Sequence, residues 1–163
     1  MYQYQTLDSP LGKLAIVSSG ERITHLMLSE EDLELFKKNF FAEEKKSDLL
    51  DDAIQQLKEY FDGNREVFEL PLSFKGTDFQ EEVWNELCNI PYGESRSYGE
   101  LAEKIGRPKA VRAVGQANRA NRLPIFIPCH RVIGKNKSLT GYAGTKTNLK
   151  DLLLTLEGTS FAK

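Results

Sequence analysis

Cysteine is scarce in this chain of 163 residues, where only Cys88 and Cys129 occur. Two cysteines at this separation provide neither the disulfide framework of a small secreted protein nor a zinc-ligand motif. The chain is long enough to bury one or two hydrophobic cores without such cross-links. We therefore expect a protein that binds no structural metal, and no residue pattern in it calls for a cofactor.

Long apolar runs and a strong net charge are also missing. No stretch approaches the roughly 20 apolar residues of a membrane helix, and the opening MYQYQTLDSPLG has neither the basic segment nor the apolar run of a signal peptide. We therefore expect a cytoplasmic protein that does not enter a membrane, with monomer as the default state. The formal net charge of -2 implies that any binding to nucleic acid depends on a local basic face.

Such a face is available, because acidic residues gather between positions 29 and 82 and basic residues between 96 and 150. This shift predicts two modules. The basic residues are Arg96, Lys104, Arg107, Lys109, Arg112, Arg119, Arg122, Arg131, Lys135, Lys137, Lys146 and Lys150.

The first module shows alternating, strand-like stretches over residues 2–28, which predict hairpins of a small sheet. Residues 47–64 have helical spacing of Leu50, Ile54, Leu57 and Phe61, with Gly63 placed to end the helix. Residues 66–77 then predict a last strand and a linker.

The second module begins with a predicted helix after a Thr or Asp cap, in which Cys88 shares an apolar face with Val83 and Leu87. Free cysteines are often buried as small apolar groups, so we expect Cys88 to pack and not to react. Ser97 and Glu100 have the spacing of a capping box, and Gly106 is placed to end the helix that follows them.

A second helix is expected to start at Pro108, directly after a short turn. Helix, turn, helix is common in DNA-binding proteins, but it also occurs as a plain corner in enzymes, and spacing alone leaves both open. The small residues Ala110, Ala113, Gly115 and Ala117 favour a helix that enters the minor groove, where one arginine can act as a wedge in the base stack.

The segment IPCHRVIG places Cys129 next to His130 and Arg131, at the end of a predicted strand that starts near Asn121. A thiol beside an imidazole and a guanidinium can lose its proton and become a nucleophile. Glu157 ends the last predicted helix, where an acid is unfavourable toward the helix dipole. A histidine partner would explain the position of Glu157, although a solvated surface glutamate remains an alternative.

These segments resemble the O6-alkylguanine-DNA alkyltransferases, also called methylated-DNA–protein-cysteine methyltransferases, of the single-chain bacterial type. The resemblance covers residues 76–158 and rests on IPYGESRSYGELAEKIGRPKAVRAVGQAN, IPCHRVIG, SLTGYAG and LLLTLEG. It implies an α/β (α+β) fold with a ribonuclease H-like sheet domain over residues 1–74. Residues 76–163 would form a winged helix-turn-helix domain that carries the active site.

The resemblance also implies roles for individual residues. Cys129 would accept the alkyl group, His130 would be its water-linked base, Glu157 would orient the histidine, and Asn121 would support this network. Tyr98 would reach the guanine, and Arg112 would fill the space that the guanine leaves in the stack. The full set implied for substrate and DNA is Tyr98, Gly99, Arg107, Arg112, Ala113, Pro124, Lys135, Tyr142 and Ala143.

The implied activity is repair of duplex DNA that contains O6-alkylguanine, and also O4-alkylthymine, by irreversible transfer of the alkyl group to Cys129. The target nucleotide would be flipped out of the duplex, and each chain would react once. Two alternatives stay open: a non-enzymatic damage-binding protein, against which Cys129 argues, and a cysteine hydrolase, against which the adjacency of Cys129 and His130 argues. Departures from the family pattern at Arg122, Thr145 and Ala143 affect the expected substrate range.

Overall fold

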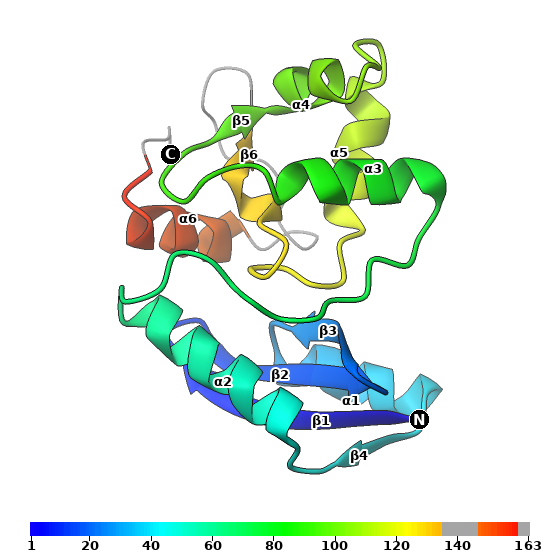
Figure 1. Ribbon diagram of the computed structural model, residues 1–163, viewed down its shortest axis with the longest axis vertical. Helices are drawn as coiled ribbons and strands as arrows, with labels where there is room; N and C mark the ends of the chain where they lie inside the picture. Colours follow the sequence, from blue (N-terminus) through cyan, green and yellow to red (C-terminus); the bar gives the residue numbers. More distant parts are fainter. Residues whose placement is uncertain (135–146, 160–163) are drawn as a thin grey trace. The chain divides into compact units, whose positions relative to one another are not determined.

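The computed structural model describes residues 1–134 and 147–159, and divides the chain into two compact units, Met1–Ser73 and Phe74–Lys163 (Figure 1). Among the described residues, none of the helices has the length and apolar character needed to cross a bilayer.

The first unit is a four-stranded sheet with a helix on each face. The strands β1 (Tyr2–Ser9), β2 (Gly12–Ser19), β3 (Arg22–Met27) and β4 (Ala42–Glu44) have the order β3-β2-β1-β4. Consecutive strands β1 to β3 pair antiparallel, whereas β4 pairs parallel with β1. The helices are α1 (Glu30–Asn39) and α2 (Asp48–Phe61), which cover opposite faces of the sheet (Figure 1).

Strand β2 forms the centre of this unit and is buried on both faces. Ala15 and Val17 pack against Leu33 and Phe36 of α1, and the alternate residues of β2 face the side of α2. The predicted hairpins and the predicted helix are therefore present. The predicted last strand is wrong, because among residues 66–77 only Leu72 pairs with a strand, in an isolated bridge to Ile23.

The second unit is mostly helical. Its elements are α3 (Asp78–Leu87), β5 (Arg96–Ser97), α4 (Tyr98–Lys104), α5 (Val111–Arg119), the 3-10 helix η1 (Cys129–Arg131), β6 (Val132–Ile133) and α6 (Thr147–Leu156). Strands β5 and β6 form a small parallel pair. Trp84 of α3 is buried and donates a 2.9 Å hydrogen bond from Nε1 to the carbonyl of Ala117, which joins α3 to α5.

The ends of α4 follow the sequence signals closely. Ser97 and Glu100 form the predicted capping box at its start. At its end Gly106 has φ +77°, and the Arg107 amide donates to the Ala102 carbonyl at 2.9 Å, which is the bond that closes a Schellman motif. Gly106 therefore turns the chain sharply toward α5.

Two expectations for this unit are wrong. Helix α5 starts at Val111 and not at Pro108, because residues 107–110 form a turn in which the Ala110 amide donates to the Arg107 carbonyl at 2.9 Å. Cys88 is exposed and not packed in the core, because α3 ends at Leu87 and Cys88 is its C-cap residue.

Candidate active site

The chain approaches Cys129 through a tight loop and not through the predicted strand. Asn121 closes this loop from both sides: its Nδ2 donates to the Ile127 carbonyl at 2.9 Å, and its Oδ1 accepts from the Leu123 amide at 2.9 Å. The buried Ile125 has φ +75°, which is strained for a β-branched residue. The loop is thus held by Asn121 in a conformation that a strand could not provide.

Cys129 starts the 3-10 helix η1 and is buried, with 3% of its surface exposed. Asn118 of α5 donates from Nδ2 to the Cys129 carbonyl at 3.3 Å, so the second helix of the pair contacts the backbone of the thiol residue. This contact was missed by the sequence reasoning, because an asparagine in a helix carries no signal of what it binds.

Glu157 is buried beside Cys129, His130 and Arg131, and it binds the last two. Its Oε2 is 2.6 Å from His130 Nε2, and both of its oxygens accept from Arg131, at 2.8 Å from Nε and 3.1 Å from Nη2. Helix α6 ends at Leu156, and Gly158 follows Glu157 with φ +73°. The turn at Gly158 leaves the Glu157 side chain directed toward η1. The unfavourable position of Glu157 at the negative end of the helix dipole is therefore offset by the hydrogen bonds from His130 and Arg131.

This arrangement sets the protonation states of the acid and the imidazole. Burial alone would raise the pKa of Glu157, but the hydrogen bonds from His130 and Arg131, together with the charge of Arg131, outweigh it and lower this pKa to about 2. Burial lowers the pKa of His130, and the bond to Glu157 opposes the change only in part. His130 is then neutral at pH 7, with Nε2–H donating to the carboxylate and the lone pair on Nδ1.

Lys150 is a fifth member of the cluster that the sequence did not reveal. Its surface is fully buried, although the sequence had placed it, with Arg131, on the basic outer face. Burial lowers the pKa of Lys150 to about 8, and the charge of Cys129 opposes this shift. Helical spacing could have indicated that Lys150 is buried, since Lys150 precedes Glu157 by about two helical turns and therefore faces the same side as Glu157.

Tyr98 reaches the cluster from α4. Its ring lies 6.0 Å from Lys150 Nζ, measured to the ring centroid. It also packs at 3.9 Å from the position that a Cβ on Gly115 of α5 would occupy. The half-buried Gly99 follows Tyr98, and Pro124 is buried in the loop before Cys129.

Several of the residues implied for DNA contact lie on the outside of this unit. Arg112 and Ala113 are exposed on α5. Arg107 is exposed too, but its Nε is 3.1 Å from Glu82 Oε2, so it already has a partner. Lys135, Tyr142, Ala143 and the departure at Thr145 lie outside the described residues.

Arg122, which departs from the family pattern, leaves the hydrogen bonds of the Asn121 loop intact. Its Nη2 donates to the Lys75 carbonyl at 2.5 Å, and its guanidinium lies 5.9 Å from the Trp84 ring centroid.

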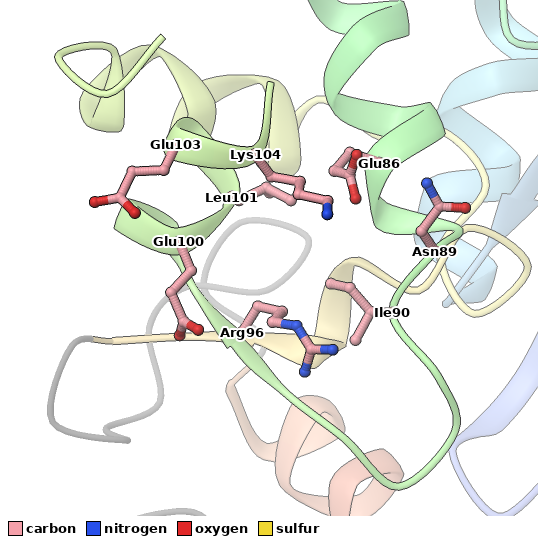
Figure 2. Close-up of a pocket in the computed structure, with 8 residues that line it drawn as sticks. All are labelled: Glu86, Asn89, Ile90, Arg96, Glu100, Leu101, Glu103 and Lys104. Carbon is pink, nitrogen blue, oxygen red and sulfur yellow. The ribbon is translucent and has the colours of Figure 1, made fainter. Parts of the chain in front are cut away.

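A separate hollow of about 600 Å³ lies between the end of α3, β5 and α4 (Figure 2). Its walls mix acidic and basic side chains, including Glu86, Arg96, Glu100 and Lys104, and include none of the expected site residues. Within the described parts of the chain no three His, Cys, Asp or Glu side chains gather as a metal site would require.

Two family models match the chain in sequence order. The ribonuclease-like domain of 6-O-methylguanine DNA methyltransferase matches residues 2–74, and the DNA binding domain of the same family matches residues 78–159. This chain belongs to the 6-O-methylguanine DNA methyltransferase family. The resemblance noted in the sequence is therefore confirmed.

Individual members of the family agree with this assignment. The constitutive methylated-DNA–protein-cysteine methyltransferase of Bacillus subtilis (strain 168) is 56% identical over 162 residues, which cover 99% of this chain and 98% of the relative. A methylated-DNA–protein-cysteine methyltransferase of Mycobacterium bovis is 45% identical over 157 residues, which cover 96% of this chain and 93% of the relative.

Solved structures confirm the predicted fold class. The Mycobacterium tuberculosis O6-methylguanine methyltransferase superposes with a TM-score of 0.87 at 44% identity, and the match covers 100% of this chain and 96% of that one. The structure of Mycobacterium tuberculosis OGT in complex with DNA gives a TM-score of 0.86 at 44% identity, covering 96% and 92% of the two chains.

Proposed function

We propose that this protein repairs duplex DNA by transferring the alkyl group of O6-alkylguanine to Cys129. The observation that carries the proposal is the buried Cys129 next to the His130–Glu157 pair, whose atoms are 2.6 Å apart, in a unit that matches the DNA binding domain of the family. We assign transfer and DNA binding to a domain of residues 76–163, and a separate domain to residues 1–74.

The proposed reaction is a single displacement. Neutral His130 takes the thiol proton of Cys129 through a water molecule, and Glu157 holds the imidazole in the tautomer that can accept it. The thiolate then forms a bond to the alkyl carbon, while the bond from this carbon to O6 breaks and its electron pair passes to guanine. The guanine takes up a proton, for which the Tyr98 hydroxyl is the proposed donor.

The buried position of Cys129 supports flipping of the target nucleotide. A thiol with 3% exposure cannot reach a base inside a duplex, so the base has to leave the stack, at a cost of a few kcal/mol. Arg112 is exposed on α5 among small side chains, which supports its proposed role in filling the space that the base leaves. The pair α4 and α5 would then act as the helix-turn-helix, docked in the minor groove.

Further details of the proposal follow from the chemistry. The thioether formed on Cys129 is stable, so each chain reacts once. We include O4-alkylthymine as a second substrate, since it presents an alkyl carbon on a similar exocyclic oxygen. A free thiol nucleophile persists in a reducing compartment, which supports a cytoplasmic location. A monomer is the state that we include in the proposal by default.

Intact mass spectrometry after incubation with O6-methylguanine duplex DNA tests this function. We expect the protein to gain one methyl group, located on Cys129 by peptide mapping, with no second turnover when DNA is in excess. Tight DNA binding without a mass change would instead support a damage-binding protein. Turnover of ester or amide substrates through Cys129 would support the cysteine hydrolase.

A further inference from the structure

The Asn121 loop, residues 121–129, keeps its shape by hydrogen bonds within itself. Asn121 bonds to the Ile127 carbonyl and the Leu123 amide, and the Ile127 amide donates to the Leu123 carbonyl at 2.8 Å. These bonds fix the conformation of the loop, but they do not attach it to the rest of the unit. A strained residue such as Ile125, with φ +75°, persists only where the surrounding structure holds it. The loop therefore needs attachments from outside.

Arg122 provides one of these attachments at the start of the loop. Its Nη2 donates to the carbonyl of Lys75, 47 positions earlier in the chain, at a distance of 2.5 Å. Its guanidinium also lies 5.9 Å from the ring centroid of Trp84 on α3. A planar guanidinium can lie over an aromatic ring and donate a hydrogen bond from its edge at the same time. Arg122 is thus held by two groups of the protein, although the residue is exposed.

The other end of the loop is attached to α5, which Trp84 joins to α3. The buried indole of Trp84 donates from Nε1 to the Ala117 carbonyl at 2.9 Å. The next residue, Asn118, donates to the Cys129 carbonyl at 3.3 Å. The two ends of the loop are therefore attached to the same pair of helices, with Trp84 between them.

Resting on the proposed function, we propose that Arg122 is a positioning residue for the alkyl transfer. It holds the start of the loop against Lys75 and Trp84, and so keeps the Cys129 thiol at the place where the alkyl carbon arrives. A misplacement of about 1 Å can slow a reaction by about a hundredfold, so a modest loosening of the loop is sufficient to slow transfer. The other role open to an exposed arginine in a DNA-binding unit is a phosphate contact. The two roles predict opposite results on substitution.

Arg122→Lys separates the two roles, because lysine keeps the positive charge but lacks the planar fork of arginine. We expect Arg122→Lys and Arg122→Ala to slow single-turnover transfer by about three- to tenfold, which the loss of one exposed cation–π contact and one hydrogen bond permits. The loss should be equal for duplex DNA and for free O6-alkylguanine base. The affinity for DNA and its salt dependence should stay those of the parent, under conditions where urea unfolding shows every variant to be folded.

Arg119→Ala is the matched control, because it removes an exposed arginine from α5. It should give the reverse pattern: weaker DNA binding with a flatter salt dependence, and an unchanged rate from the free base. Recovery of the parental rate in Arg122→Lys would overturn the proposal. So would a flatter salt dependence in Arg122→Ala with an unchanged free-base rate, since both results would assign Arg122 to a phosphate.

The contact with the indole has its own measurement, because Trp84 is the single tryptophan of the chain. Its indole N–H gives one NMR resonance, which should shift more in Arg122→Lys than in Arg119→Ala. A resonance that Arg122→Lys leaves in place would refute the attachment. This measurement requires neither DNA nor transfer, so failure of the proposed function would be seen separately, as a parent protein that gains no methyl group.

Discussion

Glu157 is the residue on which the buried cluster depends, because it binds His130 and Arg131 at once. Its replacement has two consequences, of which the first affects catalysis and the second affects stability. The imidazole loses the acceptor that fixes its tautomer, and a buried guanidinium loses its counter-charge.

We therefore predict that Glu157→Gln slows alkyl transfer and also lowers the free energy of unfolding by about 3 kcal/mol, the usual cost of breaking a buried ion pair. Single-turnover rates and urea unfolding measure the two effects. Glu103→Gln, on the exposed side of α4, is the matched control and should change stability by less than about 0.5 kcal/mol. A transfer rate equal to that of the parent would exclude Glu157 from the relay.

The nucleophile has its own test. Cys129→Ser should abolish transfer and leave DNA binding intact, because the hydroxyl is a far weaker nucleophile while α4 and α5 are unaffected. Cys88→Ser should keep the parental rate, since burial raises the pKa of the Cys88 thiol to about 11 although the residue as a whole is exposed. Methylation of DNA-treated Cys129→Ser protein at the parental rate would show that the alkyl acceptor is another residue.

At this scale the sequence predicted a histidine partner for Glu157, which the structure shows, but it did not predict how the charges around this pair are balanced. Cys129 and His130 stand in a specific motif, and an acid at a helix end signals a partner. The burial of Arg131 and Lys150 could not be predicted, because both look like surface cations until the packing of α6 against η1 is known.

At the scale of elements, α5 combines a buried side that anchors the thiol backbone with an exposed side that carries the basic residues. Asn118 lies on the buried side, and Arg112 and Arg119 lie on the exposed side. The two sides predict two separable effects of substitution.

Arg112→Ala should reduce transfer from duplex DNA and leave transfer from free O6-alkylguanine base almost unchanged, because a free base needs no flipping. Lys109→Ala is the matched control: it removes an exposed charge and should weaken all DNA binding alike, flattening the salt dependence by about one phosphate contact. The measured quantity is the ratio of duplex to free-base rates. If this ratio in Arg112→Ala equals that of the parent, Arg112 does not fill the space left by the flipped base.

Element boundaries could be predicted where capping residues determine them, as at Ser97, Glu100 and Gly106. The start of α5 could not, because Ala110 caps it without any side-chain bond. Helix α1 was not predicted at all, although Ser29 caps it. The β-branched residues before Cys129 indicated a strand, but tertiary bonds from Asn121 override this local preference.

At the scale of the whole molecule, three buried groups within the described residues bind fewer protons in the folded state than in the unfolded state. The pKa values of His130, Glu157 and Lys150 are all lowered, the last two to about 2 and about 8. Stability consequently rises with pH wherever the unfolded chain holds the extra proton.

We predict that stability falls as the pH drops below about 6.5 through His130, and falls again between about 4.5 and 2 through Glu157. It should rise between about 8 and 10.5 through Lys150. Each group contributes a slope of at most about 1.4 kcal/mol per pH unit. Urea unfolding across this range measures the profile, and Lys150→Met should remove the alkaline rise; a flat profile in the parent would contradict all three assignments.

The tight fit around Gly76 has a practical consequence for dissecting the protein. A Cβ at this position would lie 2.6 Å from the Trp84 ring, and the neighbouring Lys75 carbonyl already accepts from Arg122. An expression fragment of the C-terminal half therefore has to begin at or before Lys75 and keep glycine at position 76. A cloning scar or affinity-tag junction placed there would displace Trp84, and with it the hydrogen bond that ties α3 to α5.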